Sequence, residues 1–284
     1  GTGKTPLVKF IANELAKRGF KPGLVSRGYG GKYSGTLEVN SETTYKQTGD
    51  EAQILAKLNI PFFIDKNRSR AAKKLQEKHD VDVIISDDGL QHYAMARDLE
   101  IAVVDAVRGV GNGLLLPAGP LREPIDRLHE VDFVISNGGA SGLVAHEYVS
   151  ANRPIEFRRL SDDQSIPVAT FYEQFPWVRA LCGIGNPERF LRSLTDLGVS
   201  VEPHIYPDHH GYTGDELDFA DGSPIVCTEK DAVKLSALDI NLSHVWALEV
   251  AAELAEGFQR DLQQRLQNLN IRPKAPQAPV EQGA

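Results

Sequence analysis

The sequence has no run of apolar residues close to the roughly 18 that a membrane-spanning helix requires, so we expect no segment to cross a bilayer. Cysteine is scarce: Cys182 and Cys227 stand in short apolar stretches, which predicts buried thiols in a reducing compartment and excludes a disulfide scaffold. The net charge of −8 argues against general nucleic-acid binding, which depends on many lysine and arginine contacts to phosphates. A local basic cluster can still bind an anionic substrate.

The chain begins with what looks like the end of a phosphate-binding loop, made of Gly1, Thr2, Gly3, Lys4 and Thr5. The last three match the closing G-K-[ST] of a Walker A motif. The residues that follow carry apolar side chains at helical spacing as far as Gly19, and Pro6 suits a first helical turn. Because a helix N-terminus presents free N–H groups to a phosphate, this context predicts a nucleotide site.

Strand-like and helix-like segments alternate along the first half of the chain. Strands are expected at 23–26, 60–65, 81–88, 100–106 and 131–137, and helices at 50–58 and 68–80. Continuous apolar strands between helices predict a parallel sheet covered on both faces. The segment 107–130 is rich in glycine and proline and is expected to form loops over the active face.

A second α/β unit is expected from residue 175, with a helix that Asn186 caps and a closing helix near 253–269. The predicted fold is therefore α/β, a P-loop NTPase-like parallel sheet with a second, smaller α/β domain. We expect a core domain with its linker over 1–174, the smaller domain over 175–271 and a proline-rich disordered tail over 272–284.

Two carboxylates, Asp87 and Asp88, follow the predicted buried strand 81–88. A strand that delivers an acid beside a phosphate-binding loop is typical of a Walker B site, which holds Mg²⁺ directly or through water. An acid at a strand end can also merely cap a turn, but the upstream G-K-T helix favours the metal role. His92 lies at the same mouth, where a lone histidine is more often structural than catalytic.

Seven motifs occur in a fixed order: "GTGKTP" (1–6), "SRGYGG" (26–31), "GDE" (49–51), "DDGLQH" (87–92), "GNGLLLPAGPLRE" (111–123), "DHH" (208–210) and "TEKDAVK" (228–234). Together they resemble the tetraacyldisaccharide 4′-kinase family, the lipid A kinases of Gram-negative bacteria. The resemblance extends to about residue 250. The family begins with a membrane-associating helical segment and an earlier P-loop glycine that these residues do not include, so we expect the chain to be truncated at its N-terminus.

The resemblance implies ATP bound near a cleft between two domains. It implies transfer of the γ-phosphate to the 4′-hydroxyl of a tetraacyldisaccharide 1-phosphate, with Mg²⁺, by a peripheral enzyme on the cytoplasmic face of the inner membrane. No obligatory protein partner is evident. The segment "GLLLPAGP" (113–120) is expected either to pack in the core or to form a lip that faces the acyl chains.

The resemblance also implies individual roles. Lys4 and Thr5 match phosphate and Mg²⁺ ligands, and Asp87 and Asp88 match the Walker B pair. Asp50 matches a carboxylate proposed as catalytic base, and His209 matches its histidine partner. Positions near the substrate and the active-site mouth are matched by Arg68, Arg122, Glu123, Arg27 and His92.

From the residues alone, other interpretations stay open. Asp50 reads as the N-cap of the helix 50–58, and His209 and His210 read as a surface loop pair. The basic run 66–74 is either a solvated helix face or a binding site for a phosphate or for anionic headgroups. Two other functions compete with the kinase: a P-loop ATPase switch, and a two-metal hydrolase that uses the Asp and His side chains of the "DDGLQH" and "DHH" motifs.

Overall fold

The computed structural model describes residues 3–219 and 222–273. A four-stranded sheet forms the centre of the first half, in the order β2-β3-β1-β4. β1 (Pro22–Ser26) pairs in parallel with β3 (Phe62–Ile64) and β4 (Val83–Ser86), and β2 (Leu37–Glu38) pairs antiparallel with β3. The parallel core places the ends of β1 and β4 at one edge, as the sequence predicts.

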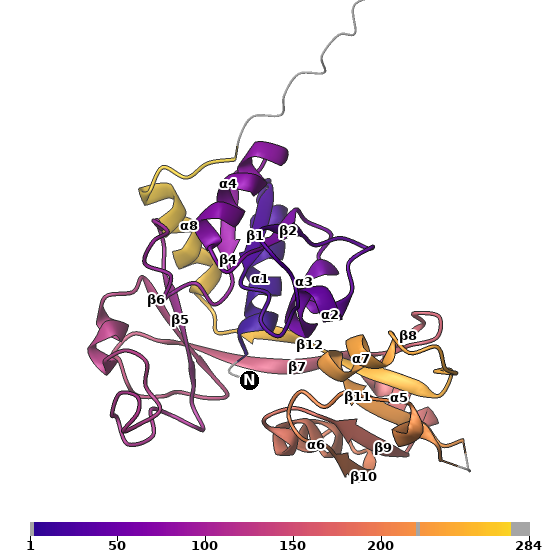
Figure 1. Cartoon of the computed structure of the whole chain (residues 1–284). Helices are drawn as coiled ribbons and strands as arrows, with labels where there is room; N and C mark the ends of the chain where they lie inside the picture. Colours follow the sequence, from indigo (N-terminus) through magenta and orange to yellow (C-terminus); the bar gives the residue numbers. More distant parts are fainter. Residues whose placement is uncertain (1–2, 220–221, 274–284) are drawn as a thin grey trace, which may run out of the picture.

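Helices cover both faces of this sheet (Figure 1). α1 (Lys4–Lys17) and α3 (Asp50–Ala56) pack Val8, Ala52 and Leu55 onto one face, and α4 (Arg68–Lys78) packs Ala71 and Leu75 onto the other. The short α2 (Tyr45–Thr48) precedes α3. The prediction of a sheet covered on both faces is therefore confirmed.

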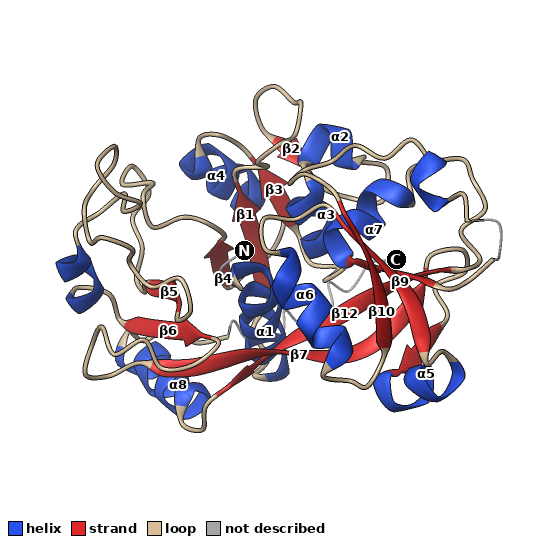
Figure 2. Cartoon of the chain, turned by 90° about the horizontal axis from the view of Figure 1, so that it is seen from below, coloured by secondary structure: helices blue, strands red, loops and turns tan. Residues whose placement is uncertain are grey.

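A second, longer sheet runs through the whole molecule in the order β10-β9-β11-β12-β7-β6-β5. Its strands are β5 (Ile101–Asp105), β6 (Phe133–Asn137), β7 (Tyr148–Arg159), β9 (Trp177–Cys182), β10 (Ser200–Ile205), β11 (Ile225–Thr228) and β12 (Val245–Leu254), and β8 (Ser165–Pro167) pairs with β7. Figure 2 shows β7 and β12 extending across the molecule. They join an N-terminal lobe (residues 3–147 with α8) to a C-terminal lobe (residues 160–244).

The C-terminal lobe carries α5 (Val168–Gln174), α6 (Pro187–Thr195), the short 3-10 helix η2 (Asp215–Leu217) and α7 (Glu229–Leu235). The side chain of Asn186 accepts a hydrogen bond from the backbone N–H of Arg189, so its predicted capping role is confirmed. The 3-10 helix η1 (Ile125–His129) interrupts the loops that follow β5 in the N-terminal lobe.

The last helix, α8 (Phe258–Asn268), returns to the N-terminal lobe, where Phe258 and Leu262 pack with Leu7 and Ile11 of α1. The proposed division at residue 174 stays a prediction, and α8 belongs by packing with the first core. Within the part of the chain that the structure describes, no helix is long and apolar enough to span a membrane.

The sequence did not reveal β7, which lies near the end of the predicted core domain and its linker. Its polar residues and central Pro154 hide any regular alternation. Its partner β12 runs to Leu254, so the closing helix begins at Phe258 rather than near 253. β7 and β12 are antiparallel, so the second sheet is mixed rather than purely parallel. Most of the predicted tail, 274–284, lies outside the described residues.

Candidate active site

The phosphate-binding end of the N-terminal lobe is built on the start of α1. Gly1 and Thr2 lie outside the described residues. Gly3 has a φ of 89°, and a Cβ there would lie 2.3 Å from Nδ2 of Asn137, so both the backbone and the space demand glycine. Lys4 and Thr5 then form the first turn of α1, whose free N–H groups can donate hydrogen bonds to a phosphate.

The predicted Walker A and Walker B residues come together. Nζ of Lys4 lies 2.6 Å from Oδ1 of Asp88, and both side chains are about half exposed. Burial alone would raise the pKa of Asp88, but the hydrogen bond from Lys4 and the charges of Lys4, Arg122 and Arg68 lower this pKa overall. Asp88 is therefore an ionised carboxylate that a lysine already neutralises.

Asp87, its neighbour, is buried. Burial, followed by the charge of Glu51, raises the pKa of Asp87 to about 6, although the charge of Lys4 acts in the opposite direction. A buried carboxyl of this kind gains from a nearby cation.

The donor set fits Mg²⁺. Thr5, Asp87 and Asp88 offer oxygen atoms, and Mg²⁺ typically binds one or two carboxylates and completes its shell with waters and phosphates. Among residues 3–219 and 222–273, no three His, Cys, Asp or Glu side chains are grouped to hold a metal. Two of the residues that the two-metal hydrolase would use, His209 and His210, face Asp50 and Glu216 instead.

Arginines surround this end of the lobe. Arg68 is buried, and its Nη2 donates to the backbone oxygen of Asp88 at 2.8 Å. This member of the basic run 66–74 therefore does not lie on a solvated helix face. Nη1 of Arg122 donates to Oε1 of Gln91 at 3.1 Å. The charge of Arg27 acts on Arg68, and the charges of Arg68 and Arg122 act on Asp88. Together they form a positive rim suited to phosphates.

His92 and Glu123 have other surroundings. Burial, followed by the charges of Arg68 and Arg97, lowers the pKa of His92, which favours a neutral imidazole. Glu123 forms an ion pair with Arg127 at 3.4 Å and accepts a hydrogen bond from Tyr93. The structure thus gives Glu123 a place beside η1, and neither residue has a contact that assigns it a catalytic role.

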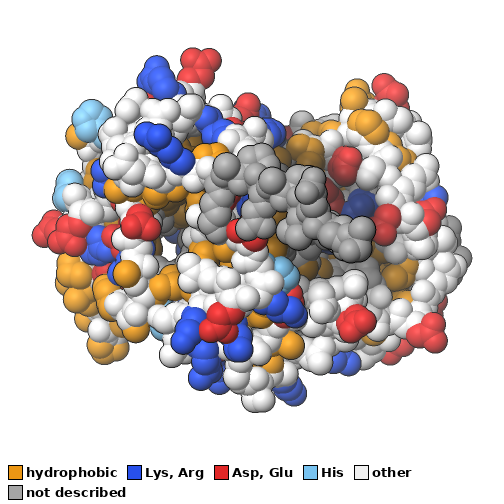
Figure 3. Space-filling model, turned by 90° about the horizontal axis from the view of Figure 1, so that it is seen from above, with side chains coloured by type: hydrophobic (Ala, Val, Ile, Leu, Met, Phe, Trp, Pro, Cys, Tyr) orange, Lys and Arg blue, Asp and Glu red, His pale blue; other side chains and the backbone are white. Residues whose placement is uncertain are grey.

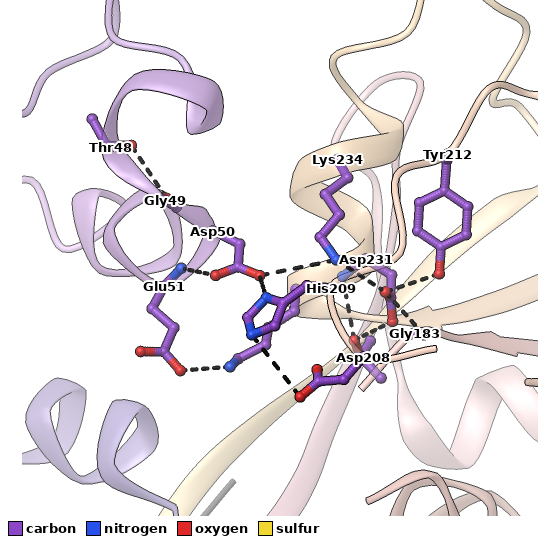
Figure 4. A network of polar contacts seen from close by, with 12 residues as sticks. Thr48, Gly49, Asp50, Glu51, Gly183, Asp208, His209, Tyr212, Asp231 and Lys234 are labelled. Carbon is purple, nitrogen blue, oxygen red and sulfur yellow. Dashed lines mark hydrogen bonds and ion pairs between the residues drawn. The ribbon is translucent and has the colours of Figure 1, made fainter. Parts of the chain in front are cut away.

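Asp50 and His209 meet across the two lobes (Figure 4). Asp50 is 6% exposed; its Oδ1 accepts a hydrogen bond from the N–H of Glu51 at 2.8 Å, and its Oδ2 lies 3.5 Å from Nδ1 of His209. The N-cap position of α3 belongs to Gly49 rather than to Asp50. The alternative interpretation of Asp50 as an N-cap is therefore wrong.

The structure also separates the two adjacent histidines. His210 pairs with Glu216 at 2.8 Å and stacks on Tyr206, whereas His209 has a φ of 62° and turns its imidazole toward Asp50. The N–H of His209 donates to the oxygen of Gly183 at 3.2 Å, which holds the loop in place. His209 is therefore the member of the pair that reaches the N-terminal lobe.

Sequence reasoning missed two groups of this site. Nη2 of Arg189, on α6, donates to Oδ1 of Asn137 at 3.1 Å, so an arginine of the C-terminal lobe lies beside the loop that Gly3 ends. Lys234, on α7, points toward Asp50 (Figure 4). Its motif, "TEKDAVK", was noticed, but the spacing carried no sign that its last lysine would meet a residue of another lobe.

Three comparisons bear on this site. A family model described as "Tetraacyldisaccharide-1-P 4'-kinase" matches residues 1–267. The chain is 44% identical to a protein named tetraacyldisaccharide 4'-kinase from Hahella chejuensis over 278 residues, which cover 96% of this chain and 80% of that protein. It is 43% identical to one of the same name from Legionella pneumophila, over 91% of this chain and 78% of that protein.

Among solved structures, the fold resembles the crystal structure of the "apo" form of LpxK from Aquifex aeolicus in complex with ATP. The TM-score is 0.78 at 26% identity, and the match covers 95% of this chain and 84% of that one.

Proposed function

The chain belongs to the tetraacyldisaccharide-1-P 4'-kinase family, and from this premise we propose that it transfers the γ-phosphate of ATP to the 4′-hydroxyl of a tetraacyldisaccharide 1-phosphate, a step of lipid A biosynthesis. The observation that carries the proposal is the contact between Asp50 and His209 across the lobes. A kinase needs a base for the acceptor hydroxyl, whereas a P-loop ATPase switch does not.

The N-terminal lobe holds the phosphates. The N–H groups at the start of α1 and the ammonium of Lys4 face the β- and γ-phosphates, and Arg27, Arg68 and Arg122 supply further positive charge around them. Lys4, which lies against Asp88 in this structure, exchanges that carboxylate for phosphate oxygens. Thr5, Asp87 and Asp88 would hold Mg²⁺, which would supply charge neutralisation for the transferred group.

The proton of the acceptor hydroxyl is accepted at the junction between the lobes. The acceptor hydroxyl is a weak nucleophile, and a carboxylate that accepts its proton as the new P–O bond forms lowers the barrier. We assign that role to Asp50, whose Oδ2 is aligned by Nδ1 of His209. Since the two residues lie in different lobes, the site is complete only when the lobes are close together.

The loop after β5 provides the contact with lipid. Leu114, Leu115 and Leu116 are 51%, 44% and 62% exposed, so the alternative of core packing is wrong for these leucines. Hydrophobic side chains gather at the left-hand edge of the face in Figure 3, the side on which β5, β6 and their loops lie in Figure 1. An apolar loop next to Arg108 and Arg122 suits the cytoplasmic surface of an anionic inner membrane.

ATP consumption measured with and without tetraacyldisaccharide 1-phosphate tests the proposal. A kinase consumes ATP in proportion to a lipid product that carries a new 4′-phosphate. ATP turnover that ignores the lipid would support the switch ATPase instead.

A further inference from the structure

Lys234 is a buried cation at the junction between the lobes. Its side chain is 6% exposed, and its Nζ has no hydrogen-bond partner within the described part of the chain. Two carboxylate oxygens face it: Oδ2 of Asp50 at 4.0 Å and Oδ1 of Asp231 at 3.9 Å. Because an isolated buried charge is costly, these two carboxylates are what makes an ammonium tolerable at this position.

Asp231 is already satisfied by its own lobe. It accepts hydrogen bonds from the hydroxyl of Tyr212 at 2.9 Å, the N–H of Gly183 at 3.1 Å and the hydroxyl of Thr228, the N-cap residue of α7. Burial raises the pKa of Asp231, while these hydrogen bonds and the charge of Lys234 act in the opposite direction. Asp231 thus anchors Lys234 from one side and leaves its ammonium directed at Asp50.

Asp50 receives both nitrogen atoms of the C-terminal lobe on one oxygen. Its Oδ1 is occupied by the N–H of Glu51, while Oδ2 faces Nδ1 of His209 at 3.5 Å and Nζ of Lys234 at 4.0 Å (Figure 4). An ammonium this close attracts the carboxylate oxygen and fixes where it points. A carboxylate oxygen held in place is what proton acceptance from a hydroxyl requires.

We propose that Lys234 is a positioning residue for the phosphoryl transfer, in which its buried ammonium faces Oδ2 of Asp50 and holds that oxygen against His209. The inference rests on the proposed kinase function. Lys234 acts through Asp50 and touches neither substrate nor phosphate.

The same helix supplies a matched control. Lys230 forms an ion pair with Glu51, so two charge pairs join α7 to α3. The charge of Lys230 also reaches Asp50, but of these two lysines it is Lys234 whose Nζ lies at Oδ2 of that carboxylate. Lys230 is also more exposed than Lys234. A role confined to docking α7 onto α3 would make the two lysines alike, whereas the proposed role makes them different.

The ionisable groups that face this junction come from several elements. From α3 these are Asp50 and Glu51, from α7 Lys230, Asp231 and Lys234, from the loop before η2 Asp208, His209 and Tyr212, and from the loop after β1 Tyr29. The Lys234→Met substitution removes one positive charge from this set and keeps the unbranched shape of the side chain. Oδ2 of Asp50 then loses one of the two nitrogen atoms that face it, so we expect kcat to fall.

The experiment measures kcat, KM for the lipid and ATP affinity between pH 5 and pH 9 for the full chain and for Lys234→Met, Lys234→Arg and Lys230→Met. In Lys234→Met kcat should fall about tenfold or more while KM for the lipid holds, because a misplaced base slows the chemical step rather than binding. Lys234→Arg should restore most of kcat, Lys230→Met should keep kcat near that of the parent, and ATP affinity should stay within about twofold, since the P-loop is untouched. A kcat of Lys234→Met equal to that of the parent, or a loss that appears only in KM, overturns the inference.

A double substitution separates action through Asp50 from action through the fold. In an Asp50→Asn background there is no carboxylate for Lys234 to hold in place, so adding Lys234→Met should lower kcat little further. A further loss that multiplies overturns the inference. If Lys234→Met does not fold, as judged by its melting transition, Lys234→Gln takes its place with the same expectations. Absence of lipid phosphorylation by the parent protein contradicts the kinase function itself, which is a different result.

Discussion

At the start of α1, Lys4 and Asp88 are about half exposed and belong to one lobe, whereas at the lobe junction Asp50 and Lys234 are almost fully buried and come from two. Exposed charges can be exchanged for those of a ligand at small cost, because water screens each of them. Buried charges depend on one another, and removing one leaves another uncompensated. The charges of the phosphate site can therefore be exchanged for those of a ligand, whereas the buried charges of the junction hold one another in a fixed geometry.

The largest effect is expected at the exposed site. Lys4→Ala removes the ammonium that faces the phosphates, so turnover should fall by about a thousandfold, a typical cost for one preorganised charge at a transferring phosphoryl group. The melting temperature should change little, because Lys4 packs on the surface. Steady-state kinetics and thermal melting check both statements.

Lys17→Ala is the control for that substitution, since Lys17 is an exposed lysine at the other end of the same helix. It should leave turnover unchanged. Near-normal activity in Lys4→Ala would remove the assignment of a P-loop to these residues.

The next effect concerns the junction. Asp50→Ala and His209→Ala should each lower kcat by about a hundredfold, within the range for general acid–base groups, with nucleotide affinity unchanged. Because residues that act as a unit are non-additive, the double variant should be little slower than the slower single one. Losses that multiply would mean that the two residues act independently. His210→Ala is the adjacent control, and its pairing with Glu216 predicts a nearly normal rate.

The contrast between the two regions also marks what could be read from the sequence. Lys4 and Asp88 meet because a helix start and a strand end lie at the same edge of a parallel sheet, which the spacing of "GTGKTP" and "VDVIISDDG" predicts. The contact of Asp50 with His209 followed only from the resemblance to a family. No local pattern links α3 to a loop of the other lobe.

The strand that makes this contact possible was itself missed. β7 pairs with β12 from Trp246↔Arg159 to Leu254↔Ser150, and this long pairing places the C-terminal lobe beside α3. Its sequence, "YVSANRPIEFRR", lacks the continuous apolar run that revealed β1, β5 and β6, because β7 is only partly buried along most of its length. Because that pairing could not be predicted, the contact of Lys234 with Asp50 could not be predicted from the sequence either.

A third prediction compares the two Walker B carboxylates by stability. Burial raises the pKa of Asp87 to about 6, so its ionised form destabilises the folded state. This destabilisation is absent below about pH 4, grows as the pH rises to about 6 and is complete above it. The pKa of Asp87 in the folded protein lies about two units above its ordinary value, which corresponds to about 3 kcal/mol of lost folding stability.

Asp87→Asn should therefore be more stable than the parent at pH 7.5 and equal to it at pH 4, in urea unfolding without Mg²⁺ or nucleotide. Asp88→Asn, whose carboxyl has a lowered pKa and pairs with Lys4, should not be stabilised at pH 7.5. Both variants should need more Mg²⁺ for transfer, since each loses an anionic oxygen. Equal stability of Asp87→Asn and the parent at both pH values would contradict the assigned burial.

The smallest effect is expected where neither phosphate nor proton is handled, at Leu114, Leu115 and Leu116. Changing all three to serine removes exposed apolar surface, so binding to vesicles of anionic phospholipid should weaken and KM for the lipid should rise about tenfold at most, while kcat and the melting temperature hold. Sedimentation with vesicles and steady-state kinetics measure this. Ile240→Ser, at an exposed apolar residue of the C-terminal lobe, is the control and should bind vesicles as the parent does. If the two variants lose binding equally, lipid contact is not a property of the loop after β5, and the acyl chains must be bound elsewhere on the protein.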